Sequence, residues 1–483
     1  MASKKINKLT IKNLITDAFT YGLGSGVQKI LNLVLIFFIS KELTVEQFGI
    51  FDFYLIFSNL IVMILVFGQD QAIARLFYNY NSFKQRQKLI SESFFFQLFL
   101  SIIFLPLNIF LLNLISTIYK INFYEPKLGI AVSFLIFLLI IFNFCINILR
   151  WDFKKNLFII GIVGNSLLAL VTIFYLKFNG TLNIINIFYC YIIANLVLSF
   201  FLFTKIKKWI KFSTKIYYLK EIFKYGIPLG LISILTSSLI FIERSVILNY
   251  FTEYHLGIYA IAGKLALIVF FFVQSFQLSW GPFVFKTYKT KKIIDTYNVI
   301  VKIFIFSTIT ILFSVCFWSE TLIKLLSSEK YLDAKNLIFP LSLAFIILGL
   351  GNIINIGIKL AKRSELNLIS NLIFFLSTIS LFYLFTLNNY FLGIAWSIVL
   401  GQLILIIIEF YFAQKVFPMK WKFFKSIFIL LILLVFFHFL FQYEFQTLHK
   451  TLVYLSINFL FFFGFYLTII KHEKNFLKKK ISN

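Results

Sequence analysis

Few residues of this 483-residue sequence could build a soluble catalytic centre: it has three cysteines and four histidines. All three cysteines (Cys145, Cys190 and Cys316) lie inside apolar runs, so we expect neither a disulfide framework nor a CxxC metal site. The histidines show no HExxH or other paired metal spacing, and no GxxxxGK[ST] nucleotide-binding loop occurs. We therefore expect no metal, no cofactor and no ATP hydrolysis by this chain.

Long polar segments are also absent. The two longest connections between apolar runs, 205–224 and about 319–336, are shorter than a segment that folds alone. This weighs against a membrane glycosyltransferase, polymerase or ligase, which would need a sizeable soluble face to hold sugar donors or acceptors. We expect that the chain is not an enzyme.

Apolar residues, by contrast, are abundant: the sequence is 60% hydrophobic and contains 67 phenylalanines. Soluble domains are about 45–50% apolar, and a helix of about 20 apolar residues crosses a bilayer. The fold class predicted is an all-α polytopic membrane protein with about 14 transmembrane helices. We place the spans at about 15–39, 47–68, 90–114, 128–149, 157–176, 183–204, 225–248, 257–279, 298–318, 337–357, 366–386, 391–413, 424–442 and 451–470.

Basic residues alternate between loops. The formal net charge is +27, and most of the 46 lysines and arginines fall in every second connection, including the amino-terminal segment, 205–224 and the carboxyl-terminal tail. The positive-inside rule then places both termini in the cytoplasm. Because these residues lie between apolar spans rather than on a folded basic domain, we read them as membrane anchors and expect no nucleic acid partner.

A short internal repeat divides the chain. The turn TVEQFGIF at 44–51 matches TEYHLGIY at 252–259, 208 positions later. Repeats at half-chain distance are common in transporters, and six spans per repeat imply a pseudo-two-fold axis along the membrane normal. We predict two six-helix lobes, a basic linker and two further spans with a basic tail. The corresponding ranges are 1–204, 205–224, 225–413 and 414–483.

Charged residues inside spans are the candidates for function, because a cation in the bilayer usually faces a cavity or a partner. Lys29 is deep in the first span, which favours a cavity role. Arg244, beside Glu243, and Lys264 should lie at comparable depth on adjacent helices. Snorkelling to the headgroups and a self-neutralising Glu243–Arg244 pair are the alternatives. Glu409, near the end of the twelfth span, is a candidate proton or sodium ligand.

Glycine and proline positions suggest how some helices pack and start. Gly22 and Gly26 have the GxxxG spacing that favours close helix packing. Pro228 and Pro340 lie near the predicted starts of their spans, where proline is tolerated, so we read both as markers of helix starts.

Two segments carry a family resemblance. SKELTVEQFGIFDFYLIFSNLIVMILVFGQDQAIARLF, and YGIPLG followed by IERSVILNYFTEYHLGIYAIAGKLA, resemble the Wzx-like oligosaccharide flippases, which belong to the multidrug/oligosaccharidyl-lipid/polysaccharide exporter superfamily. The shared features are the early-span start at Tyr225, the Gly257 turn, the acidic–Arg pair Glu243–Arg244 and the opening of the eighth span up to Lys264. Glu243 departs from the family, where aspartate is more usual. The match covers mainly residues 21–80 and 225–288.

The resemblance implies a flippase that works by alternating access. Its cargo would be an oligosaccharide repeat unit on a polyprenyl diphosphate. This cargo would move from the inner to the outer leaflet of the bacterial cytoplasmic membrane for O-antigen, lipopolysaccharide or capsule synthesis. Lys29, Arg244 and Lys264 would bind the diphosphate or acidic sugars, with Arg75 at the cytoplasmic mouth. Membrane lipids, and the polymerase and chain-length proteins of the same pathway, would be partners.

The driving force would be a proton gradient, a sodium gradient or the membrane potential. Glu409 is a candidate coupling residue, and Glu243 would either position Arg244 or take part in ion coupling. An ion-coupled drug or metabolite antiporter should carry acidic residues within its first spans, whereas Asp17 and Asp70 lie at span edges. A lipid II flippase should carry several arginines in its first two spans, where this chain offers Lys29 and Arg75. Both remain alternatives.

Overall fold

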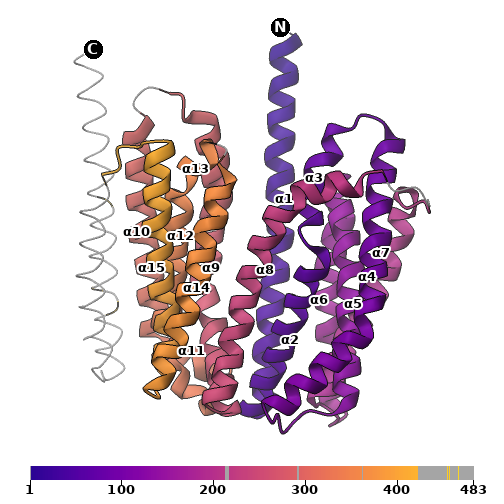
Figure 1. Cartoon of the computed structure of the whole chain (residues 1–483), viewed down its shortest axis with the longest axis vertical. Coiled ribbons are helices and arrows are strands. Elements are labelled where there is room, and N and C mark those ends of the chain that lie inside the picture. The colour runs from indigo at the N-terminus through magenta and orange to yellow at the C-terminus, as the bar shows by residue number, and fades with distance from the viewer. Residues whose placement is uncertain are drawn as a thin grey trace. The chain divides into compact units, whose positions relative to one another are not determined.

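The computed structural model describes residues 2–212, 217–290, 293–361 and 363–422, together with Tyr454, Ser456 and Tyr466, although not the side chains of 2–19 and 364. All regular elements in these ranges are helical (Figure 1). Twelve described segments are long and apolar enough to cross a membrane, and they coincide with the first twelve predicted spans. The all-α polytopic fold is thereby confirmed. The last two predicted spans, 424–442 and 451–470, lie outside the described ranges.

Contacts divide the chain into two compact units, Met1–Gly257 and Ile258–Asn483. The lobe boundaries predicted around 205–224, and the pseudo-two-fold relation of the lobes, stay predictions. The first unit contains α1 (Ala2–Glu42), α2 (Val45–Val66), α3 (Gln69–Asn79), α4 (Phe83–Ile118), α5 (Pro126–Trp151), α6 (Lys155–Phe178), α7 (Ile184–Ile206), the 3-10 turn η1 (Lys207–Trp209) and α8 (Leu219–Tyr250).

Within the first unit, α5 packs along α7 and α4, α1 along α6, and α2 along α8. α8 begins six residues before its predicted span. Its start is fixed by Glu92 on α4, whose carboxylate accepts the backbone N–H groups of Tyr217, Tyr218 and Leu219 at 3.0, 2.6 and 3.2 Å. These groups have no intrahelical partner at a helix start. Pro228 consequently lies inside α8, so its assignment as a helix start was wrong.

A sharp break separates α2 from α3. Phe67 and Gly68 both adopt left-handed backbone conformations, with φ of 44° and 72°. A Cβ atom on Gly68 would overlap the carbonyl oxygen of Gly226 and lie 2.7 Å from the amide nitrogen of Gly230, both on α8. The break therefore packs directly on the backbone of α8, and glycine is needed on both sides of the contact.

The second unit contains most of α9 (Glu253–Thr287), with α10 (Ile293–Phe317), α11 (Ser319–Leu326), the 3-10 segment η2 (Glu329–Ala334), α12 (Lys335–Ile354), α13 (Ile356–Leu360), α14 (Ser364–Leu387) and α15 (Phe391–Val416). α15 packs along α12 and α14. Asn355 interrupts the tenth span between α12 and α13. Pro340 lies inside α12, so it does not mark a helix start as predicted.

Glycine packing in α1 also differs from the GxxxG prediction. Among the described residues, no atom lies within 4 Å of a Cβ atom built on Gly22 or Gly26. Gly24 makes the close contact instead, where a Cβ atom would lie 2.7 Å from Ile159 on α6. The prediction therefore named the wrong glycines of this run.

Candidate functional site

The candidate site lies where α2 and α8 pack together, and the amino-terminal cap of α2 sets its position. Thr44 and Gln47 form a reciprocal capping box, in which the Gln47 N–H donates to Thr44 Oγ1 and the Thr44 N–H donates to Gln47 Oε1, each at 3.2 Å. Such a box satisfies two backbone groups that a helix start leaves exposed. Asp52 follows two turns later and faces α8.

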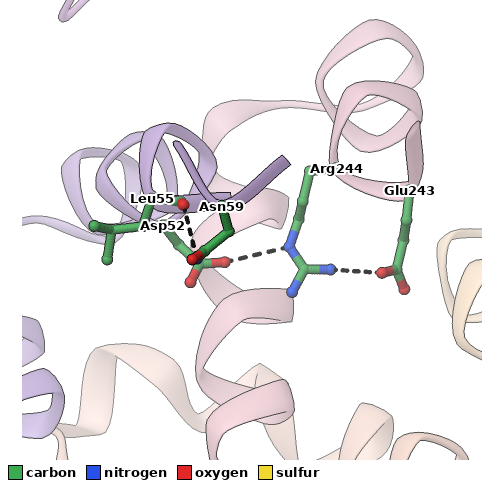
Figure 2. Close-up of polar contacts among 5 residues, drawn as sticks. All are labelled: Asp52, Leu55, Asn59, Glu243 and Arg244. Atoms are coloured by element: carbon green, nitrogen blue, oxygen red, sulfur yellow. Dashed lines mark hydrogen bonds and ion pairs between the residues drawn. The ribbon is translucent and has the colours of Figure 1, made fainter. Parts of the chain in front are cut away.

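Arg244 on α8 lies between two carboxylates. Its Nε is 3.3 Å from Oδ2 of Asp52, and its Nη1 is 3.0 Å from Oε2 of Glu243 (Figure 2). All three residues are buried: Asp52 is 1%, Glu243 4% and Arg244 7% exposed. Asn59, two turns after Asp52, is exposed, and its amide donates to the carbonyl of Leu55 at 3.0 Å.

In this geometry the Asp52–Arg244 ion pair links two membrane helices, α2 and α8. A buried charge is costly unless a partner of opposite sign lies close, and removing one partner leaves the other uncompensated. The ion pair therefore stabilises the packing of α8 on α2 as long as both charges remain. An external anion could therefore bind the Arg244 guanidinium only if it displaced these carboxylates or shared the guanidinium with them.

The two copies of the repeated turn meet next to this site. A Cβ atom on Gly49 would lie 2.8 Å from the carbonyl oxygen of Glu253, and one on Gly257 would overlap the carbonyl oxygen of Val45. Since Val45 and Glu253, like Gly49 and Gly257, occupy equivalent repeat positions, the contact is reciprocal, as at an isologous interface. Thr252 also caps α9 as Thr44 caps α2, with the His255 N–H 3.4 Å from its Oγ1.

The other predicted site residues are spread over both units. In the first unit Lys29 on α1 and Arg75 on α3 are exposed, and the Arg75 guanidinium lies 4.6 Å from the ring centre of Tyr225. In the second unit Lys264 on α9 is half-buried. The structure thus joins Glu243 to Arg244, the pairing that the sequence analysis gave as an alternative to a cavity role. The common depth of Arg244 and Lys264 stays a prediction.

Glu409 on α15 is 4% exposed and accepts a hydrogen bond from the Asn355 amide at the α12–α13 interruption. Gly351 leaves room for it, because a Cβ atom there would lie 3.3 Å from Glu409 Oε2. A buried carboxylate beside an interrupted span is the kind of group that transporters use to bind a proton or a cation. Its role as a coupling residue remains a hypothesis.

Asp52 is the site residue that the sequence reasoning missed. It lies inside the second span, where the rule for intramembrane charges that singled out Lys29 would also have found it. The statement that aspartates of the first spans lie at span edges was therefore incomplete. Its pairing with Arg244 could not be predicted from the spacing of residues along one helix, because the two residues are 192 positions apart.

The fold and the family of the chain follow from comparison with known proteins. Residues 39–336 match the family described as "Polysaccharide biosynthesis protein". The chain is 25% identical to Lsg locus protein 1 of Haemophilus influenzae over 58% of its own length and 67% of that protein. It is also 25% identical to the capsular polysaccharide biosynthesis protein CapF of Staphylococcus aureus, over 52% of the chain and 65% of CapF. The chain thus spans about two thirds of the length of these relatives.

Among solved structures, the lipid II flippase MurJ in an inward closed conformation aligns with a TM-score of 0.73 at 18% identity, covering 93% of this chain and 99% of MurJ. An inward-facing multidrug resistance MATE family transporter aligns with a TM-score of 0.63 at 17% identity, covering 80% and 94%. These likenesses establish the fold, which is that of membrane transporters. The chain is a multi-pass membrane protein and belongs to the polysaccharide biosynthesis protein family.

Proposed function

We propose that this protein is a flippase for polyprenyl-diphosphate-linked oligosaccharides. It would move them by alternating access from the inner to the outer leaflet of the bacterial cytoplasmic membrane, for O-antigen, lipopolysaccharide or capsule synthesis. One observation carries the proposal: a member of a polysaccharide biosynthesis family consists, over its described length, almost entirely of membrane-spanning helices with a transporter fold. Such a chain serves polymer assembly by moving a precursor, and it would do no covalent chemistry.

Cationic side chains would recognise the cargo. In this proposal Lys29, Arg75, Arg244 and Lys264 bind the diphosphate or acidic sugars. Arg75 and Lys29 are exposed on their helices, whereas Arg244 is held by Asp52 and Glu243. The diphosphate would therefore compete with Asp52 for the Arg244 guanidinium, since a guanidinium binds phosphate oxygens as well as carboxylate oxygens.

A proton or sodium gradient, or the membrane potential, would drive transport. Glu243 and Glu409 are the proposed coupling residues: Glu243 contacts Arg244, and Glu409 is buried at the interruption of the tenth span. Both termini would lie in the cytoplasm. The polymerase and chain-length proteins of the same pathway would receive the product.

Asp52 supports a second candidate function, an ion-coupled drug or metabolite antiporter. It is a buried carboxylate inside the second span, the kind of group that such a transporter would use to bind a cation. The MATE-like fold is compatible with this reading, and the MurJ-like fold is equally compatible with a lipid II flippase. Membership of the polysaccharide biosynthesis family favours the oligosaccharide cargo.

Depletion of the protein from its host tests the proposal. We expect a polyprenyl-diphosphate oligosaccharide to accumulate in the cytoplasmic leaflet while surface polysaccharide disappears, and mass spectrometry of the trapped lipid would identify the sugar. Accumulation of lipid II would replace this cargo with the peptidoglycan precursor. Unchanged polysaccharide with altered drug or cation sensitivity would instead establish the antiporter.

A further inference from the structure

A second polar cluster lies beyond the other end of α2, roughly 20 Å or more along the helix from Asp52. We call it the Asp70 network. Asp70 on α3 accepts a hydrogen bond from the Asn147 amide on α5 at 2.7 Å, and Asn147 Oδ1 accepts one from Arg150 at 2.9 Å. Gln69, next to Asp70, accepts a bond from Ser93 on α4 at 2.7 Å. The network therefore links three helices.

One side of this network is shielded from water, whereas Asp70 and Asn147 are half-buried and Arg150 is exposed. Gln69 and Ser93 are 0% exposed, Gln97 is 1% exposed, and the Asp70 Oδ1 atom is shielded from solvent. Among the described residues, Asp70 has no basic side chain within 4.0 Å. Burial raises the pKa of Asp70 to about 6, although Arg150, Asn147 and Gln97 act in the opposite direction. The network thus holds a carboxylate close to its protonation point under physiological conditions.

Other charged or titratable groups on the packed elements have contacts of their own. Arg75, on the same helix, lies over the ring of Tyr225 on α8. Glu92 on α4 accepts the backbone N–H groups at the start of α8, and Glu221 on α8 accepts a bond from Tyr80. The remaining charged or titratable groups on α3, α4, α5 and α8 are Tyr78, Lys84, Arg86, Lys88, Lys127, Cys145, Lys220, Lys224, Glu243, Arg244 and Tyr250. Arg150 is the charge that acts on Asp70 directly.

Asp70 lies directly beside the break between α2 and α3. It is the second residue of α3, directly after the left-handed pair Phe67–Gly68. The Phe67–Gly68 break packs on the α8 backbone at Gly226 and Gly230, and α3 itself packs along α8. A change in the first turn of α3 is therefore transmitted to α8 without an intervening flexible side chain.

We propose that Asp70 is a proton-binding site, and that gain or loss of this proton changes how α3 packs against α8. The carboxylate takes up one proton from water to form a neutral carboxylic acid, which suits its shielded Oδ1 atom. After deprotonation the negative charge must be stabilised, either by water that enters beside the carboxylate or by a closer approach of Arg150. We expect either change to displace the first turn of α3. Its bearing on transport rests on the proposed function, in which a proton gradient is one of the candidate driving forces.

Infrared titration of the purified protein in lipid tests the site without any transport assay. Wild type should show a carboxyl group that titrates near pH 6, and Asp70→Asn should lack it. Asn147→Ala, which removes a hydrogen bond to the carboxylate, should move this titration to higher pH. Asp152→Asn is the matched control, because Asp152 is a partly exposed carboxylate that two lysines neutralise, Lys208 at 3.5 Å and Lys154 at 3.6 Å. Identical spectra for wild type and Asp70→Asn would overturn the proposal.

Thermal stability provides a second readout. Because the folded-state pKa is raised from 3.8 to about 6, the stability that Asp70 contributes is full below pH 3.8 and is lost as pH rises through 6. Asp70→Asn should therefore unfold at a higher temperature than wild type at pH 7.5, and the difference should shrink toward pH 4. If Asp70→Asn does not fold, Asn147→Ala still tests the site through its shifted titration.

Spin labels at Tyr78 on α3 and Ile227 on α8, both exposed, test the conformational part. The distance between them should change between pH 5 and pH 8 in wild type and remain at its low-pH value in Asp70→Asn. An unchanged wild-type distance would overturn the link between Asp70 and α8. If these titrations appear but wild type moves no lipid-linked oligosaccharide, the proton site stands and the proposed cargo fails.

Discussion

Arg244 shows, at the scale of single residues, why a simple truncation can mislead in a membrane protein. Its guanidinium contacts Asp52 and Glu243, and both carboxylates are buried. Losing one partner of a buried pair costs about 3–5 kcal/mol, because the remaining charge is left uncompensated. Loss of transport in Arg244→Ala would therefore combine lost cargo binding with lost helix packing.

A neutral replacement of the whole cluster separates the two effects. We expect Arg244→Ala to lower the thermal midpoint and to abolish transport. The triple variant Asp52→Asn/Glu243→Gln/Arg244→Gln removes all three buried charges and replaces both carboxylates with amides of the same shape, so it should recover most of the stability but no transport. Thermal unfolding in detergent and complementation of depleted cells measure the two quantities. Complementation by the triple variant would remove Arg244 from the cargo site.

At the scale of helices, the twelve described spans were predictable because a helix that crosses the bilayer needs about 20 apolar residues. Such runs are visible directly in the hydropathy of the sequence. The helix ends were less predictable. α8 starts at Leu219 because Glu92 of another helix accepts its first N–H groups, a long-range contact that no local pattern encodes. The Glu243–Arg244 pair was visible as neighbours in sequence, whereas the Asp52–Arg244 pair required α2 and α8 to be packed.

The reciprocal contact between the repeated turns makes a prediction for glycine. Gly257→Ala should destabilise the protein by about 1–3 kcal/mol and impair transport, because its methyl group would overlap the Val45 carbonyl, which cannot move aside. Gly22→Ala is the matched control: no described atom lies within 4 Å of its methyl group, and alanine favours a helix by up to about 1 kcal/mol. Equal thermal midpoints for the two variants would contradict the close turn contact.

For the whole molecule, the alternation of basic loops predicts the orientation in the membrane, and this orientation decides from which leaflet a cargo could enter. A flippase that loads its cargo in the inner leaflet must present its entrance to the cytoplasm. The positive-inside rule places the segment after α7 there and the α6–α7 turn on the opposite face. α7 is the span between these two segments, so their accessibilities should be opposite.

Cysteine labelling of intact cells checks this orientation. Phe212→Cys, at a position that is 71% exposed, should react with a membrane-impermeant maleimide only after the cells are opened. Thr181→Cys, exposed in the α6–α7 turn, should react in intact cells. The native cysteines are buried and should contribute little background. If both positions reacted from outside, α7 would not cross the membrane. If their order were reversed, both termini would be external and the cargo would enter from the wrong leaflet.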